Sequence, residues 1–130
     1  MMMKIVVFGG SGFIGSHVAD ELSTRGHEVS IYDLKKSPYL REGQKMRIGD
    51  LLDEKKVADA ASGADYVYNF AGVSSLDLAR AASIDTIKQN ILGNANVLDA
   101  CVKAGVKRFV YASTIYVYSE KGGFYRCSKQ

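Results

Sequence analysis

The fold is decided by one short stretch, Gly9-Gly10-Ser11-Gly12-Phe13-Ile14-Gly15. An apolar run at 5–8 precedes it, and the residues that follow repeat at helical spacing, with Ile14, Val18 and Leu22 on one face. Gly26 is a natural end for that helix. The glycines therefore lie at a strand-to-helix turn, which is the context that makes such a motif informative.

Three glycines of this turn have a physical purpose. Gly9 allows a tight turn at the strand end, Gly12 lets a pyrophosphate approach the backbone, and Gly15 lets the helix lie close to the sheet. The free N–H groups and the positive dipole end of the helix then attract phosphate. We expect a dinucleotide site here; the alternative is a tight turn that binds no ligand.

Composition limits the other possibilities. The 130 residues suffice for one domain with a core, and the net charge of +3 has no basic block, so no nucleic-acid partner is expected. The N-terminal apolar run is too short for a membrane segment and contains Lys4. Cys101 and Cys127 lack metal-ligand spacing, so we predict no metal site and reduced thiols in a cytoplasmic protein.

Strand and helix patterns alternate along the chain. This order predicts an α/β fold, a doubly wound parallel sheet of five strands with helices on both faces. The expected strands are 4–9, 28–33, 46–50, 65–70 and 108–113, and the expected helices are 13–25, 53–61, 83–104 and one that begins near Phe124.

Two features of the last helices matter for organisation. The helix at 83–104 carries a stripe that we expect to face the sheet, formed by Ile84, Ile87, Ile91, Ala95, Leu98 and Val102. The chain ends inside the next helix, which lacks a stop signal. We therefore expect 1–130 to be the N-terminal part of a longer protein, truncated before its last strands and a substrate domain. The alternative is a complete small domain with a frayed end.

Acidic residues end two of the predicted strands. Asp33 lies 18 residues after Gly15, where a carboxylate accepts hydroxyls of an adenosine ribose and repels a 2′-phosphate. That position favours NAD over NADP, although Lys35 and Lys36 follow it. Asp50 and Leu51 close the third strand, where the adenine should lie; a simple turn aspartate is the alternative.

A candidate catalytic pair is Tyr125-x-x-x-Lys129, because residues four apart share a helix face and a lysine cation favours a neighbouring phenolate. Such a tyrosine can accept a proton from a hydroxyl while hydride leaves the carbon. Tyr32 and Lys36 repeat the spacing at a strand end, where four residues span about 13 Å and no pair should form. Thr114 ends the fifth strand and can hold the reacting oxygen.

The chain resembles the N-terminal part of an extended short-chain dehydrogenase/reductase, and is most similar to the NAD-dependent epimerase/dehydratase family that acts on nucleotide sugars. The matching segments occur in family order. They are 9–15, Asp33, Gly49-Asp50-Leu51, Asn69-Phe70-Ala71-Gly72, Asn90-Ile91-Leu92-Gly93-Asn94, Ser113-Thr114-Ile115-Tyr116-Val117-Tyr118 and Tyr125-Arg126-Cys127-Ser128-Lys129.

This resemblance implies a role for each matching position. The backbone of Phe13 and Ile14 would contact the pyrophosphate, Asp33 and Leu34 the adenine ribose, and Asp50 and Leu51 the adenine. Phe70, Ala71 and Gly72 would line the nicotinamide side, with Asn90 supporting that sheet edge. Thr114, Tyr125 and Lys129 would be catalytic, and Lys129 would also hold the nicotinamide ribose. A nucleotide-sugar substrate and a homodimer, built from 83–104 and the helix at Tyr125, are also implied.

Departures from the family narrow these expectations. Ile115 and Tyr116 stand where related dehydratases and decarboxylases have acids, which favours an epimerase or a simple reductase. Ser119 replaces a usual glycine, and the segment between Thr114 and Tyr125 is short. We expect residues 1–130 alone to be catalytically inactive. An NAD(P)-dependent reductase of a small carbonyl or sugar and a non-catalytic dinucleotide-sensing module stay open as alternatives.

Overall fold

The computed structural model describes residues 1–130 and contains one parallel sheet of five strands. The strand order is β3-β2-β1-β4-β5, so the chain starts in the middle of the sheet and builds outward in both directions. The strands are β1 (Lys4–Phe8), β2 (Glu28–Asp33), β3 (Lys45–Ile48), β4 (Tyr66–Asn69) and β5 (Arg108–Tyr111). The predicted fold class is therefore confirmed.

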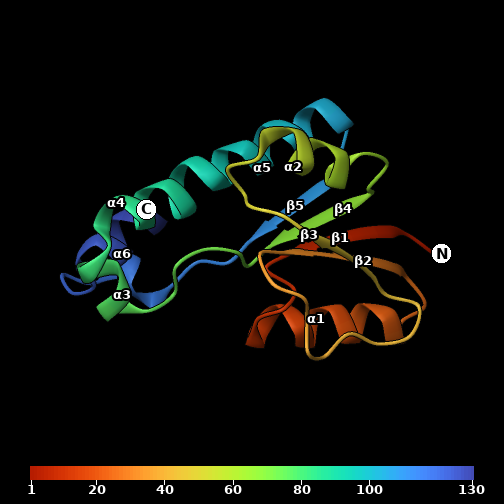
Figure 1. Ribbon diagram of the computed structural model, residues 1–130, viewed down its shortest axis with the longest axis horizontal. Coiled ribbons are helices and arrows are strands. Elements are labelled where there is room, and N and C mark those ends of the chain that lie inside the picture. Colours follow the sequence, from red (N-terminus) through yellow and green to blue (C-terminus); the bar gives the residue numbers. More distant parts are fainter.

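Helices cover both faces of this sheet (Figure 1). Helix α1 (Phe13–Thr24) lies on one face, and α2 (Glu54–Ala61) and α5 (Gly93–Ala104) lie together on the other. Each face has its own apolar core. The larger core contains Phe8, Tyr32, Val57 and Val97 under α2 and α5. The smaller one joins Val7, Val29 and Ile31 to Ala19 of α1.

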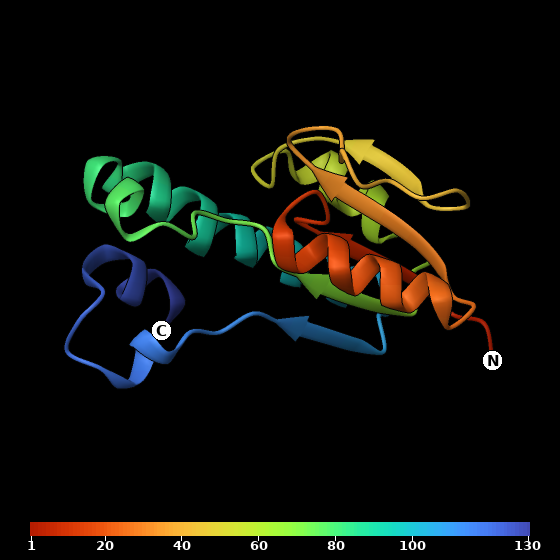
Figure 2. The same cartoon turned by 90° about the horizontal axis from the view of Figure 1, so that it is seen from below.

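The remaining helices form a separate lobe beyond the carboxyl ends of the strands (Figure 2). These helices are α3 (Leu76–Ala81), α4 (Ser83–Ile87) and α6 (Gly123–Lys129), with a 3₁₀ turn at Ile115–Tyr118. Helix α3 and this turn were absent from the sequence expectation. Helix α4 continues through a π-helical turn, Lys88–Leu92, into α5, so the predicted helix at 83–104 is present with one wide turn.

The sheet-facing stripe predicted for 83–104 is wrong. Its large members, Ile84, Ile87, Ile91, Leu98 and Val102, are between 41% and 80% exposed. The buried side of the same helix carries Gly93, Val97, Ala100 and Cys101 instead. Small side chains are needed there, because a Cβ on Gly93 would lie 2.9 Å from the Leu51 side chain. The bulky stripe faces outward because the helix packs too closely to admit it.

Helix α1 shows the same preference for small residues. Its buried positions are Gly15, Ser16 and Ala19, whereas Ile14 is mostly exposed. Val18 and Leu22, the other members of its predicted apolar face, are only partly buried.

No helix has the length and apolar character needed to cross a bilayer. No group of three or more His, Cys, Asp or Glu side chains is arranged to hold a metal ion.

Candidate functional site

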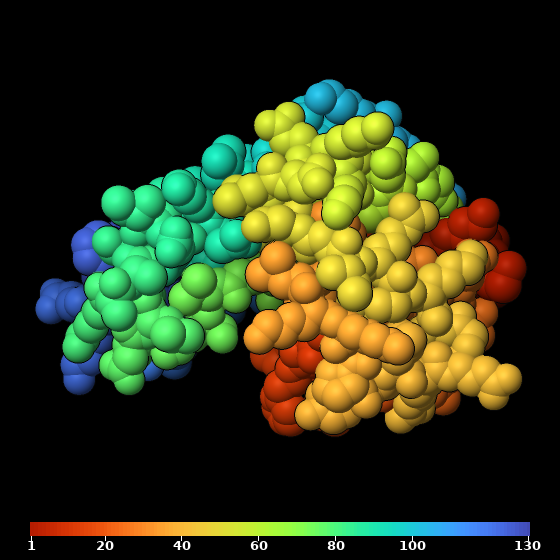
Figure 3. Space-filling model, viewed as in Figure 1, coloured from red at the N-terminus to blue at the C-terminus, as the bar shows by residue number.

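A cavity of about 780 Å³ runs along the carboxyl edge of the sheet, between the body of the fold and the lobe. Figure 3 shows that lobe, green to blue, beside the red-to-yellow body. The cavity joins most of the predicted site residues: Gly9, Gly12, Phe13, Ile14, Gly15, Asp33, Leu34, Leu51, Phe70, Ala71, Gly72, Tyr125 and Lys129. Residues from segments far apart in the sequence therefore line one continuous cavity.

The glycine turn has the geometry that the sequence predicts. Gly9 has a φ of +78°, and a Cβ there would lie 2.5 Å from the Ala71 nitrogen. A Cβ on Gly15 would lie 2.1 Å from the Gly9 carbonyl oxygen, so these two glycines are required by the fold itself. Gly12 differs, because a Cβ there meets only the Gly9 oxygen, at 3.4 Å. The space above Gly12 is therefore open.

The start of α1 is suited to an anion. Gly12 is its N-cap and supplies no side-chain hydrogen bond, so N–H groups of the first turn lack a capping acceptor. No acidic side chain lies in that turn. A helix N-terminus with open N–H groups and an uncrowded glycine fits a dinucleotide pyrophosphate.

Asp33 is held in place by the glycine turn. The Ser11 N–H donates to Asp33 Oδ2 at 3.0 Å, and the Ser11 hydroxyl donates to the Lys35 carbonyl at 2.7 Å. One carboxylate oxygen remains for a ribose hydroxyl. Sequence reasoning missed this Ser11 contact, because it depends on the approach of two separate turns.

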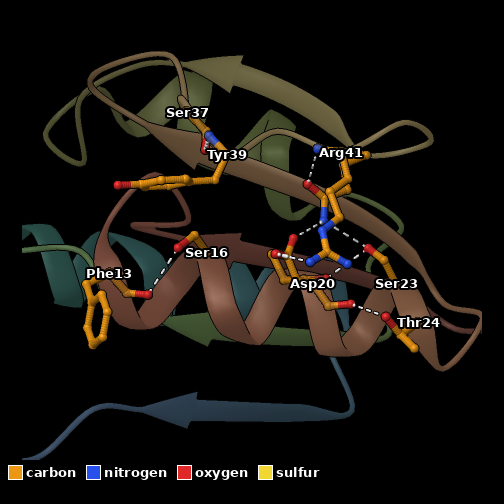
Figure 4. Close-up of polar contacts among 10 residues, drawn as sticks. Phe13, Ser16, Asp20, Ser23, Thr24, Ser37, Tyr39 and Arg41 are labelled. Atoms are coloured by element: carbon orange, nitrogen blue, oxygen red, sulfur yellow. Dashed lines mark hydrogen bonds and ion pairs between the residues drawn. The ribbon is translucent and has the colours of Figure 1, made fainter.

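The connection at 34–44 is anchored on α1 (Figure 4). Asp20 accepts from Arg41 at 3.0 Å and from the Gln44 amide at 3.1 Å, and the same amide donates to the Ser23 hydroxyl. Gln44 is buried by this packing. The network fixes the far end of the connection whose near end, Leu34 to Lys36, lines the cavity.

The third strand end is arranged differently from the expectation. Leu51 lines the cavity, but Asp50 does not. Asp50 Oδ1 accepts from the Leu52 N–H at 3.0 Å and from the Gln89 amide at 3.1 Å. The carboxylate therefore ties the turn to the π-helical turn of the long helix. Gln89 also lines the cavity and has no signal in the sequence.

Tyr32 and Lys36 do not pair, as predicted. The Tyr32 hydroxyl donates to the Asp50 carbonyl at 2.6 Å, and the side chain is only 2% exposed. Burial, with smaller effects of Asp53 and Asp50, raises the pKa of Tyr32 to about 12. This phenol is structural.

Asn90 connects the loop after β4 to α6. Its Oδ1 accepts from the Val73 N–H at 2.8 Å, and its Nδ2 donates to the Val73 carbonyl at 3.0 Å and to Ser128 Oγ at 2.8 Å. Ser128 in turn donates to the Tyr125 carbonyl at 2.7 Å. Asn90 is buried and does not line the cavity, so it acts as a clamp rather than as a contact.

Tyr125 and Lys129 lie one turn apart on α6 and both line the cavity. The rings of Tyr116 and Tyr125 meet in a T-shaped arrangement, with centroids 6.2 Å apart. Thr114 caps the 3₁₀ turn, and its Oγ1 accepts from the Tyr116 N–H at 3.4 Å. The neighbouring Ser113, rather than Thr114, lines the cavity.

These features define an α/β domain of the Rossmann class, with a long site at the carboxyl edge of its sheet. The chain belongs to the NAD dependent epimerase/dehydratase family, whose model matches residues 5–128.

Relatives of known activity are similar over most of this chain. A UDP-N-acetyl-alpha-D-glucosaminuronate decarboxylase of Bacillus cytotoxicus is 36% identical over 92% of this chain and 39% of its own length. A 3-beta-hydroxysteroid dehydrogenase of Mycolicibacterium neoaurum is 34% identical over 85% of this chain and 32% of its own. A UDP-glucose 4-epimerase of Klebsiella pneumoniae is 32% identical over 92% of this chain and 94% of its own length.

Solved structures agree on the fold. The UDP-glucose 4-epimerase of Thermotoga maritima, solved with UDP-glucose, matches with a TM-score of 0.90 and 28% identity. The match covers 98% of this chain and 48% of that one. The chain thus spans about half of this neighbour and about two fifths and one third of the first two relatives.

Proposed function

We propose that this chain binds NAD along the carboxyl edge of its sheet. The observation that supports this most is one cavity with Asp33 and the glycine turn at one end and Tyr125 and Lys129 at the other. The open space at Gly12 and the uncapped start of α1 fit the pyrophosphate between them. Leu34 would pack beside the adenine ribose, Leu51 beside the adenine, and Phe70, Ala71 and Gly72 beside the nicotinamide.

The selectivity for NAD follows from Asp33. Its free carboxylate oxygen can accept a hydrogen bond from the ribose, and its charge would repel a 2′-phosphate. Ser11 keeps the carboxylate from turning away. Lys35 and Lys36 are exposed. They would reduce the selectivity for NAD only by placing an ammonium group beside the 2′ position of the adenosine ribose.

The reactive end suits proton transfer coupled to oxidation of an alcohol. When bound, NAD supplies the acceptor for hydride from the substrate carbon. Tyr125 takes the hydroxyl proton, and Lys129 stabilises the phenolate and holds the nicotinamide ribose. Thr114 stays the predicted donor to the reacting oxygen, because its Oγ1 accepts from the Tyr116 N–H and its hydroxyl hydrogen is free. Ser113 rather than Thr114 lines the cavity here, so this role requires the 3₁₀ turn to move toward the substrate. Asn90 holds α6 and the loop after β4 in register.

For the whole protein we propose a nucleotide-sugar epimerase, of which residues 1–130 are the cofactor-binding part. The relatives that act on UDP-sugars support this class, and Ile115 and Tyr116 leave no acid for elimination at that turn. A dehydrogenase is the second candidate, because steroid dehydrogenase and 2-alkyl-3-oxoalkanoate reductase relatives are equally similar. We expect 1–130 alone to lack epimerase activity.

Both cysteines are free, which fits the predicted cytoplasmic location.

The outward stripe on α4 and α5 supports the proposed homodimer. Five large apolar side chains along α4, the π-helical turn and α5 lie open to solvent. Exposed apolar side chains gathered along one helix are typical of an interaction site. A second copy would cover it by helix–helix packing.

Calorimetric titration of the purified chain with NAD and with NADP tests the proposal. We expect NAD to bind and NADP to bind at least tenfold more weakly. A Tyr125→Phe variant should bind NAD as the wild type does, because the phenol oxygen acts on the substrate. Tighter binding of NADP would contradict the assignment of Asp33, and no binding of either would contradict the site.

A further inference from the structure

The environment of Lys129 is unusual for a lysine. Its ammonium group is half-buried at the cavity wall, and no carboxylate lies within ion-pair distance of it. Its polar partner is the Ala112 carbonyl oxygen, 3.2 Å from Nζ. Burial lowers the pKa of Lys129 below its ordinary value. A single carbonyl dipole is a weak counterpart for a desolvated cation.

The second group beside this ammonium is an aromatic face. Lys129 Nζ lies 4.5 Å from the centroid of the Tyr111 ring. A cation within about 6 Å of a ring centroid is attracted by the negative face of the π system, more strongly when water is excluded. Tyr111 is itself partly buried. Its pKa is raised mainly by burial and to a smaller extent by the nearby Tyr125 phenol, so Tyr111 stays neutral near pH 7.

The position of Tyr111 is set by the sheet. It ends β5, where it pairs in register with Asn69 of β4, and its ring stacks on Phe109 at 6.3 Å with 14° between planes. Lys129, in contrast, has a long side chain on the last turn of a short helix. The rigid ring therefore determines where the flexible ammonium rests, rather than the reverse.

We propose that Tyr111 is a positioning residue, whose ring face keeps the charged Lys129 ammonium at the cavity wall, one helical turn from Tyr125. The proposal rests on the proposed function of Lys129 toward the cofactor and adds the group that holds it there. The ring face matters and the Tyr111 hydroxyl does not, because that hydroxyl has no hydrogen-bond partner in the protein. Phenylalanine should replace Tyr111, and an aliphatic residue should not.

The test measures the Lys129 ammonium directly. Protein labelled with ¹³C at lysine Cε is titrated by NMR, and the Lys129 signal is assigned from its loss in a Lys129→Arg variant. Tyr111→Leu should lower the pKa of Lys129 by about half a unit to one unit, because the cation–π attraction is lost while burial remains. Tyr111→Phe should leave it within about 0.2 unit of the wild type.

A matched control and a second readout complete the design. Tyr66→Leu removes a partly buried strand tyrosine from β4 that holds Arg108 instead, with the guanidinium 5.8 Å from its ring, and should not move the Lys129 signal. Calorimetry should show NAD bound about three- to tenfold more weakly by Tyr111→Leu and normally by Tyr111→Phe, as a lost contact of this size implies.

An unchanged Lys129 pKa in Tyr111→Leu overturns the proposal, and so does an equal fall in Tyr111→Phe. A similar fall of the Lys129 pKa in the Tyr66→Leu control would indicate a general loosening of the fold, and it also counts against the proposal. If the wild type fails to bind NAD, the proposed function is contradicted, while the Lys129 titrations of the three variants and the wild type still decide the role of Tyr111.

Discussion

Two glycines of the same turn should fail in different ways when alanine replaces them. In Gly15→Ala the new Cβ would lie 2.1 Å from the Gly9 oxygen and 2.9 Å from the Gly10 Cα, so backbone must move. Overpacking of this kind costs about 1–3 kcal/mol. For a chain of this length that lowers the Tm by roughly 3–15 °C.

Gly12→Ala should leave the fold almost unchanged. Its Cβ meets one atom, at 3.4 Å, and the φ of −80° suits any residue. Alanine is a poorer N-cap than glycine by up to about 1 kcal/mol. The reduced entropy of the unfolded chain offsets this by about 0.4–1 kcal/mol. The two effects nearly cancel, so the Tm should stay within about 2 °C of the wild type.

Binding of NAD should show the opposite order. The methyl group of Gly12→Ala would occupy the place proposed for the pyrophosphate at α1, and a lost hydrogen bond to a charged group costs about 1.5–3 kcal/mol. The Kd should rise about 10- to 150-fold. Thermal unfolding without ligand and calorimetry with NAD separate the two quantities. Wild-type affinity in Gly12→Ala, or its unfolding, would refute the reasoning that this glycine is kept for a ligand.

Three further outcomes are expected. Asp33→Ser should weaken NAD binding about tenfold and improve NADP binding, because a hydrogen bond to a charged group and a repulsion are both removed; an unchanged NAD-to-NADP ratio in calorimetry would contradict the assignment. Ile91→Glu should lower self-association measured by sedimentation, whereas the equally drastic Leu78→Glu on exposed α3 should not; equal effects would argue against the stripe. At pH 8, iodoacetamide should modify the exposed Cys127 and leave Cys101 until the chain unfolds, since burial raises the pKa of the Cys101 thiol to about 11; mass spectrometry of the peptides would show the reverse if Cys101 were accessible.

The parts of the molecule that follow from local chemistry could be predicted from the sequence. The turn at Gly9 needs a positive φ, β2 ends at Asp33 as predicted, and five strands separated by helices leave a parallel sheet as the natural arrangement. Tyr125 and Lys129 share a helix face by spacing alone. Each of these depends on residues close together in the chain.

Contacts between distant turns could not be predicted. Ser11 reads as a small residue in a loop until β1 and β2 bring it to Asp33. Asn90 and Ser128 are 38 residues apart and join only because the lobe folds back on the long helix. The Asp50 carboxylate accepts hydrogen bonds from two N–H groups instead of lining the cavity. This arrangement depends on the position of Gln89 in the π-helical turn.

The long helix shows why periodicity alone misassigned a face. Two stripes satisfy helical spacing, one of bulky Ile, Leu and Val residues and one that runs through Asn90, Gly93, Val97 and Ala100. The structure buries the second, because Gly93 lets the helix approach Leu51 and because Asn90 finds three hydrogen bonds inside. Apolar periodicity shows which face of a helix is apolar, but it does not show whether the sheet or another molecule covers that face. Where the sheet needs close approach, small residues face it, and the bulky stripe faces solvent.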